Sequence, residues 1–154
     1  DCIDLVRQYL DQGNNPDAPG YFFEWLVKKT DVYAFRFEGS WFDIGSLDGY
    51  IAALETLLSS TWISPNADVK GKIIEPVYIG ENVRIDDKSR VGPYVVLNDD
   101  VCVHESTIER SLIMNNTYLR STKVHHSMIG EKAHIEGGHI RESILASYTK
   151  LKME

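Results

Sequence analysis

Aliphatic residues recur at every sixth position in the middle of the chain. Between residues 79 and 103 five successive steps carry one, at Ile79, Ile85, Val91, Leu97 and Val103. A small or β-branched residue follows each of them four positions later, at Val83, Ser89, Val95, Val101 and Thr107. A period of six fits neither a helix, with about 3.6 residues per turn, nor a strand, with a period of about two. It is typical of a parallel β-helix of hexapeptide repeats, in which three repeats make one coil of a triangular prism.

Further along the chain the period becomes 16 residues. Three equivalent segments begin at Ser111, Ser127 and Ser143, and each serine is followed by two hydrophobic residues. Two other columns keep the same spacing: Leu119, Ile135 and Leu151, and Ile108, Val124 and Ile140. We therefore predict that the β-helix continues, with about five coils over residues 63–151. An antiparallel sandwich of short strands is the alternative, but it gives no reason for three columns to share one period.

The first 60 residues follow helix and turn patterns instead. Ile3, Val6 and Leu10 share one helical face in a segment that stops at Gly13. Residues 14–20 predict a turn, residues 21–29 a second short helix and residues 31–37 a strand. Ser46 is placed to cap a third helix over residues 47–58. We predict two parts, 1–60 and 61–154, and expect the first to pack on a missing partner or on the first coils, since one strand cannot cover two amphipathic helices.

Composition and charge narrow the classes of partner. The 154-residue chain is 43% hydrophobic and 25% charged, a soluble composition with material for one or two small domains. Its net charge of -7 argues against a nucleic acid or an anionic membrane as partner. No apolar run approaches the roughly 20 residues of a membrane span, and no signal peptide begins the chain, so we expect a cytoplasmic protein. Cys2 and Cys102 are far apart, and we expect two reduced thiols.

The stretch WFDIGS, residues 41–46, places one carboxylate, Asp43, between aromatic residues and an Ile-Gly turn. Residues 13–54, GNNPDAPGYFFEWLVKKTDVYAFRFEGSWFDIGSLDGYIAAL, resemble the end of the catalytic domain of the sugar-1-phosphate nucleotidyltransferases, which make NDP-sugars from a nucleoside triphosphate and a sugar phosphate. The repeats resemble the C-terminal left-handed β-helix of longer members, including glucose-1-phosphate thymidylyltransferase-like and mannose-1-phosphate guanylyltransferase-like proteins. The resemblance covers the whole chain. It implies a mainly β fold, a left-handed parallel β-helix preceded by a small α/β remnant of the catalytic domain.

The resemblance also implies a role for Asp43. In the family the Asp of this motif helps to hold Mg²⁺, which neutralises the phosphates. A second carboxylate and a Gly-rich phosphate loop complete that site from an N-terminal nucleotide-binding domain, and neither occurs in this chain. We therefore expect a C-terminal region with no complete catalytic site, inactive alone and without a cofactor of its own. The alternative for Asp43 is to accept N–H bonds where the next helix begins. Gly49 stands where the family usually has an acid that completes a capping box.

Histidines in the repeat region allow a different class of function. Many hexapeptide-repeat proteins are acyltransferases that use a histidine as general base, usually in a loop that protrudes from a coil. Here no insertion breaks the period between residues 103 and 151, and no two histidines share a 16-residue column. Surface positions are the simpler interpretation for His104, His125, His126, His134 and His139. Arg110, Arg120 and Arg141 could bind a phosphorylated effector, but are most simply a solvated face.

Assembly or regulation is the role that the resemblance implies for the β-helix, and a non-catalytic scaffold is a further alternative. Flat faces suit side-by-side packing, relatives commonly associate through this domain, and closed cyclic symmetry is usual in homo-oligomers. We expect a homo-oligomer, a trimer first and a dimer next. Outward residues such as Tyr118 would make the contact, whereas inward residues such as Ile129 would form the core.

Overall fold

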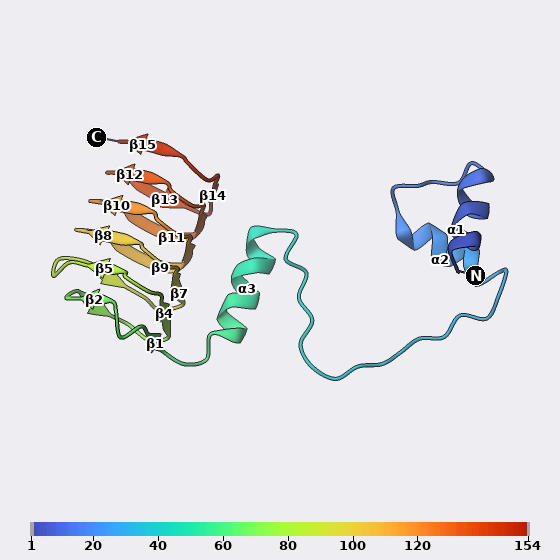
Figure 1. The fold of residues 1–154 in the computed structure, drawn as a ribbon, viewed down its shortest axis with the longest axis horizontal. Helices are drawn as coiled ribbons and strands as arrows, with labels where there is room; N and C mark the ends of the chain where they lie inside the picture. Colours follow the sequence, from blue (N-terminus) through green and yellow to red (C-terminus); the bar gives the residue numbers. More distant parts are fainter. Residues whose placement is uncertain (1, 154) are drawn as a thin grey trace. The chain divides into compact units, whose positions relative to one another are not determined.

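The computed structural model describes residues 2–153. The chain divides into two compact units, Asp1–Ser40 and Trp41–Glu154. The first unit contains α1 (Cys2–Asp11) and α2 (Pro19–Leu26), and the second contains α3 (Leu47–Leu57) and all fifteen strands of the described residues (Figure 1). The structure therefore groups α3 with the strands, beyond the boundary that we expected at residue 60.

The first unit is a helix pair held by aromatic contacts. Tyr9 of α1 is 4% exposed, and its ring meets Phe22 and Trp25 of α2 edge-on, at centroid distances of 5.4 and 5.7 Å. Gly13, with φ of +73°, follows the end of α1 as predicted. The second helix starts at Pro19, inside the segment expected to be a turn, because proline suits the first turn of a helix.

The strand predicted over residues 31–37 is wrong, since these described residues form no strand. Tyr33, Phe35 and Phe37 are exposed there, and the backbone has no neighbouring strand to pair with. An alternating pattern stabilises a strand only when a second strand supplies hydrogen bonds.

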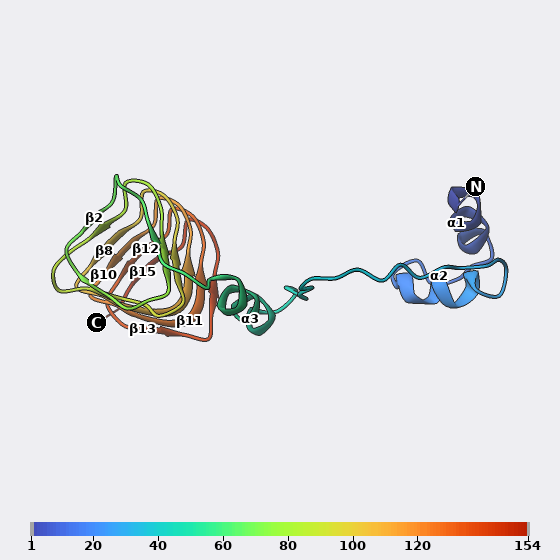
Figure 2. The same ribbon diagram turned by 90° about the horizontal axis from the view of Figure 1, so that it is seen from below.

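The second unit is a parallel β-solenoid with three flat faces (Figures 1 and 2). The first face consists of β1 (Trp62–Ile63), β4 (Val77–Ile79), β7 (Val95–Leu97), the ends of β9 (Thr107–Ile113) and β11 (Lys123–Ile129), and β14 (Ile144–Leu145). The second consists of β2 (Asp68–Val69), β5 (Arg84–Ile85), β8 (Cys102–His104), β10 (Tyr118–Arg120), β12 (His134–Glu136) and β15 (Lys150–Lys152). The third consists of β3 (Lys72–Ile73), β6 (Arg90–Val91), the starts of β9 and β11, and β13 (His139–Arg141).

Strand pairing confirms the predicted columns. Ile79 pairs with Leu97 one coil later, at the 18-residue step, and Leu97 pairs with Ile113 at the 16-residue step. The columns at 108, 124 and 140 and at 119, 135 and 151 are also in register. The second face has six strands, so the solenoid has six turns and not the five expected. The expectation counted the steps between coils, and five steps separate six strands.

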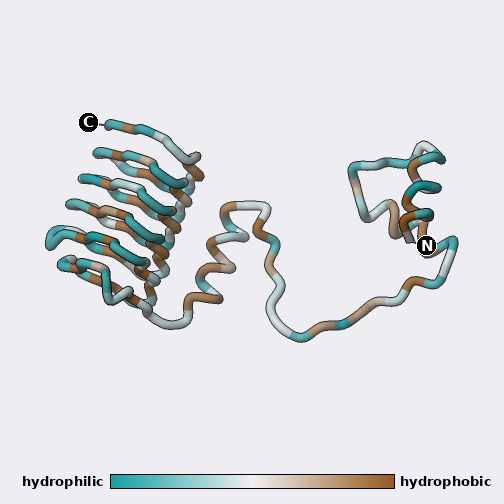
Figure 3. Tube along the Cα trace, in the orientation of Figure 1, coloured by the Kyte–Doolittle hydropathy of each residue, from teal (hydrophilic) through white to brown (hydrophobic). Residues whose placement is uncertain are grey.

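The core is the column of inward aliphatic residues. Ile79, Leu97, Ile113 and Ile129 are all fully buried, and equivalent residues of the other faces pack against them. Figure 3 shows hydrophobic positions recurring at the same place in successive coils. Each buried aliphatic side chain contributes about 1.5–3 kcal/mol before the entropy of ordering is subtracted. Short strands of two or three residues are therefore stable here because they stack, not because each is a strong strand.

Buried serines join successive coils at one corner. Ser127 N donates to Ser111 Oγ at 3.1 Å, and Ser143 N donates to Ser127 Oγ at 3.2 Å. Each hydroxyl also donates to a carbonyl two residues earlier, Ser111 to Glu109 O at 2.7 Å and Ser127 to His125 O at 2.8 Å. A buried hydroxyl needs such partners. This ladder explains why serine recurs at the 16-residue period.

Candidate functional site

Asp43 lies in an exposed loop directly before α3. Its Oδ1 accepts a hydrogen bond from Gly45 N at 3.0 Å. The alternative role considered for Asp43, as an acceptor of backbone N–H bonds, is thus present, but at Gly45 and not in the first turn of the helix. Capping of α3 belongs to Ser46, whose Oγ accepts from Gly49 N at 3.1 Å, as predicted.

Gly49 is required by the fold of this loop. A Cβ atom at this position would clash with the backbone carbonyl of Asp43 and lie 3.2 Å from Ser46 Oγ. The acid that completes a capping box in the family therefore has no room here unless the loop moves. Glycine lets the chain of WFDIGS fold back over the first turn of α3, which fixes the position of Asp43.

Asp43 does not form a metal centre with other residues of this chain. Among the described residues no group of three or more His, Cys, Asp or Glu side chains could hold a metal ion. A single carboxylate is a suitable donor for Mg²⁺, which prefers oxygen ligands, but it is not a complete site. The residues present therefore fit only one part of the expected centre.

Two ionic contacts join α3 to a corner of the solenoid. Asp48 Oδ1 lies 2.8 Å from His126 Nε2, and Glu55 Oε1 lies 2.8 Å from Arg110 Nε in an ion pair without hydrogen-bond geometry. Arg110 and His126 stand 16 residues apart, and both have positive φ, 45° and 48°, where β9 and β11 turn from one face to the next. These two residues are not simply a solvated face, because they hold the helix.

The other histidines do not form an acyltransferase-like arrangement. His104 and His134 lie on either side of the Tyr118 ring, at centroid distances of 5.6 and 4.6 Å. His134 Nε2 lies 3.2 Å from Glu136 Oε1, and His139 is exposed. Only the Nδ1 atom of His125 is buried without a hydrogen-bond partner among the described residues.

The two remaining arginines are exposed, as expected. Arg120 ends β10, and Arg141 ends β13 with its Nε 3.2 Å from Glu142 Oε1. Of the two cysteines, Cys102 is a free, half-buried thiol, and the side chain of Cys2 lies outside the described part of the structure.

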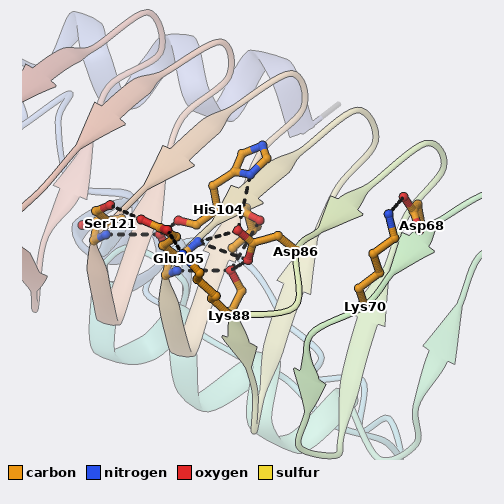
Figure 4. A network of polar contacts seen from close by, with 11 residues as sticks. Asp68, Lys70, Asp86, Lys88, His104, Glu105 and Ser121 are labelled. Atoms are coloured by element: carbon orange, nitrogen blue, oxygen red, sulfur yellow. Dashed lines mark hydrogen bonds and ion pairs between the residues drawn. The ribbon is translucent and has the colours of Figure 1, made fainter.

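A network of polar contacts crosses the coils at another corner of the solenoid (Figure 4). Asp86 accepts from Ser89 Oγ at 2.5 Å and from Glu105 N at 3.0 Å, and lies 3.5 Å from His104 Nδ1. Burial raises the pKa of Asp86, but the hydrogen bonds from Ser89 and Glu105 and the nearby His104 outweigh it and hold the pKa below its ordinary value. A hydrogen bond from Lys88 likewise lowers the pKa of Glu105. These contacts stitch neighbouring coils together and leave no group placed for catalysis.

An apolar groove runs between α3 and the first face. It has a volume of about 580 Å³ and no charged lining residue. Its walls are Tyr50, Leu54 and Leu57 of α3, and its floor includes Val96 and Leu112. We did not predict this feature, although the sequence holds a signal for it in outward hydrophobic residues that share the coil period.

Comparison with known proteins decides the family. Residues 73–154, just over half of the chain, match the family model described as the GMPPB C-terminal domain. This chain belongs to that family. The GMPPB C-terminal domain is the C-terminal domain of mannose-1-phosphate guanylyltransferase, and together with the solenoid it confirms the resemblance to a sugar-1-phosphate nucleotidyltransferase C-terminal β-helix.

The match to the GMPPB C-terminal domain starts at β3, so Asp43 and α3 lie outside it. No curated protein matches the chain. None of the helices in residues 2–153 is long and apolar enough to cross a membrane.

Proposed function

We propose that this chain is the C-terminal region of a sugar-1-phosphate nucleotidyltransferase, an enzyme that converts a nucleoside triphosphate and a sugar 1-phosphate into an NDP-sugar and pyrophosphate. The observation that carries the proposal is the family of residues 73–154, in a chain whose WFDIGS motif stands directly before α3. The nucleotide-binding half would come from residues that precede this chain. The β-helix would serve assembly or regulation.

Asp43 would supply one carboxylate to the Mg²⁺ site of the intact enzyme. Its exposed position and its hydrogen bond from Gly45 support this role, because the bond orients one oxygen and leaves the side chain accessible. The other ligands would come from the nucleotide-binding half. When bound, the ion would neutralise charge on the phosphates. The part that this chain plays is to hold Asp43 in place, through Gly45 and through the close approach of its backbone to Gly49.

The acidic net charge of -7 supports a cytoplasmic enzyme of nucleotide-sugar biosynthesis that binds neither nucleic acid nor an anionic membrane. The acyltransferase alternative lacks a specific observation in its favour. The histidine closest to a carboxylate, His126, uses it to hold α3 against the solenoid.

The test is pyrophosphate release with Mg²⁺, nucleoside triphosphates and sugar 1-phosphates, mannose 1-phosphate with GTP first. The protein translated from the complete reading frame should release pyrophosphate, whereas residues 1–154 alone should not. Release by residues 1–154 alone, or none by the complete protein with any pair, would contradict the proposal. Acetyl transfer from acetyl-CoA by residues 1–154 would favour the acyltransferase instead.

A further inference from the structure

One face of the solenoid carries a continuous column of outward hydrophobic side chains. Strand pairing on the first face brings six of them into register: Trp62, Tyr78, Val96, Leu112, Met128 and Ile144. The matching outward column of the second face is mostly polar or charged: Asp68, Arg84, Cys102, Tyr118, His134 and Lys150. A contiguous apolar surface on one side only marks a contact with another element.

The helix α3 covers one edge of this first face. Its two ionic contacts, to Arg110 and His126, lie at the corner where the first face begins. Leu112 is only 7% exposed, whereas Tyr78 is 37% exposed and Ile144 is 63% exposed. A face of about six residues is roughly 20 Å wide at about 3.3 Å per residue, and a helix with its side chains is about 10–12 Å wide. About half of the face is therefore left beside α3.

The apolar groove occupies this open half, and the flank of α3 that borders it is itself apolar. Tyr50, Ala53, Leu54 and Leu57 follow helical spacing along that flank. Leu57 is 68% exposed. The groove thus has the width of a helix, and α3 has a second apolar side that needs a neighbour.

We propose that α3 of a second copy fills this groove, in a dimer with two-fold symmetry. A two-fold axis would place each α3 in the groove of the other copy, so that two antiparallel α3 helices lie side by side between two first faces. Such an isologous contact uses the same surface twice, and the groove with its apolar helix flank is self-complementary in this sense. Because no lining residue is charged, the contact brings no like charges together despite the net charge of -7 on each chain.

This inference deepens the assembly role proposed above and rests on it only in that the β-helix unit is used for association. It favours the dimer over the trimer expected first from the sequence. A three-fold ring joins two different surfaces of each copy, whereas the groove and the α3 flank form one surface that can pair with itself.

The test is the mass of residues 1–154 by light scattering over a dilution series at tens of micromolar. We expect a dimer. Leu57→Glu should give a monomer with an unchanged melting temperature, since Leu57 is exposed within one chain. The matched control is Ile144→Glu, which alters an aliphatic residue of the same face that does not line the groove and is 63% exposed. This variant should remain a dimer, as should Tyr118→Glu on the second face.

A monomer or a trimer for the unaltered chain would overturn the proposal. So would a dimer that survives Leu57→Glu or that dissociates with Tyr118→Glu. The pyrophosphate assay of the complete protein does not depend on these outcomes, so a failure of the dimer and a failure of the proposed function are distinguishable.

Discussion

The backbone carbonyl of Asp43 packs against Gly49 so closely that a Cβ atom there would clash with it. This contact joins the loop of the WFDIGS motif to the first turn of α3. It gives Gly49 a structural reason in a position where the related enzymes usually have an acid, and it means that the orientation of Asp43 depends on a glycine six residues later.

Gly49→Ala should therefore loosen this loop. Alanine is intrinsically better than glycine in a helix by about 1 kcal/mol, but the clash with the Asp43 backbone should exceed that gain, since overpacking costs about 1–3 kcal/mol. Hydrogen exchange of the amides of Gly45 and of the first turn of α3 should become faster. The control is Gly20→Ala in α2, where a Cβ meets nothing within 4 Å, and slower or equal exchange is expected around it. Unchanged exchange in Gly49→Ala would show that the contact is not tight.

Asp86 should make the solenoid sensitive to acid. Its pKa in the folded state is below the ordinary value of 3.8, so the ionised side chain stabilises the fold above that pH, and the contribution is lost as the pH falls through the folded pKa. Asp86→Ala should cost about 1–3 kcal/mol in the free energy of unfolding at pH 7 and less at pH 3. Urea unfolding at both pH values measures this. Asp87→Ala, its exposed neighbour, is the control and should change little.

Ile129 tests the inward column directly. It is fully buried in the core, so Ile129→Asp places an unpaired carboxylate there at a cost of several kcal/mol and should unfold the solenoid. The outward Ile144→Asp, on a strand that pairs with the same segment, should keep the fold. Circular dichroism during heating separates the two. A cooperative transition at an unchanged temperature for Ile129→Asp would contradict the assigned register.

The repeats were readable from sequence because every coil uses the same inward positions, so columns such as Ile108, Val124 and Ile140 report the period without any alignment. The segment that holds Tyr33 and Phe35 was misread because its alternation has no partner strand within residues 2–153. A strand pattern states which side chains share a face, but not whether a neighbour exists to bond the backbone.

The contacts of α3 could not be predicted in the same way. Asp48 and His126 are 78 residues apart, and their meeting depends on the corner at which the helix rests. Nothing local distinguishes His126 from an exposed histidine of the same coil. The outward column that includes Val96 and Leu112 was a readable signal, because hydrophobic residues on the outside of a repeat fold call for a cover.

The most direct test of the proposed function is Asp43→Asn in the protein translated from the complete reading frame. Pyrophosphate release should fall by orders of magnitude, with higher Mg²⁺ concentrations needed for the residual rate. The melting temperature should stay nearly unchanged, because the side chain is exposed and makes one hydrogen bond. Asp17→Asn, at another exposed position, should keep the full rate. Equal rates for Asp43→Asn and the unaltered protein would remove Asp43 from the site and contradict the account.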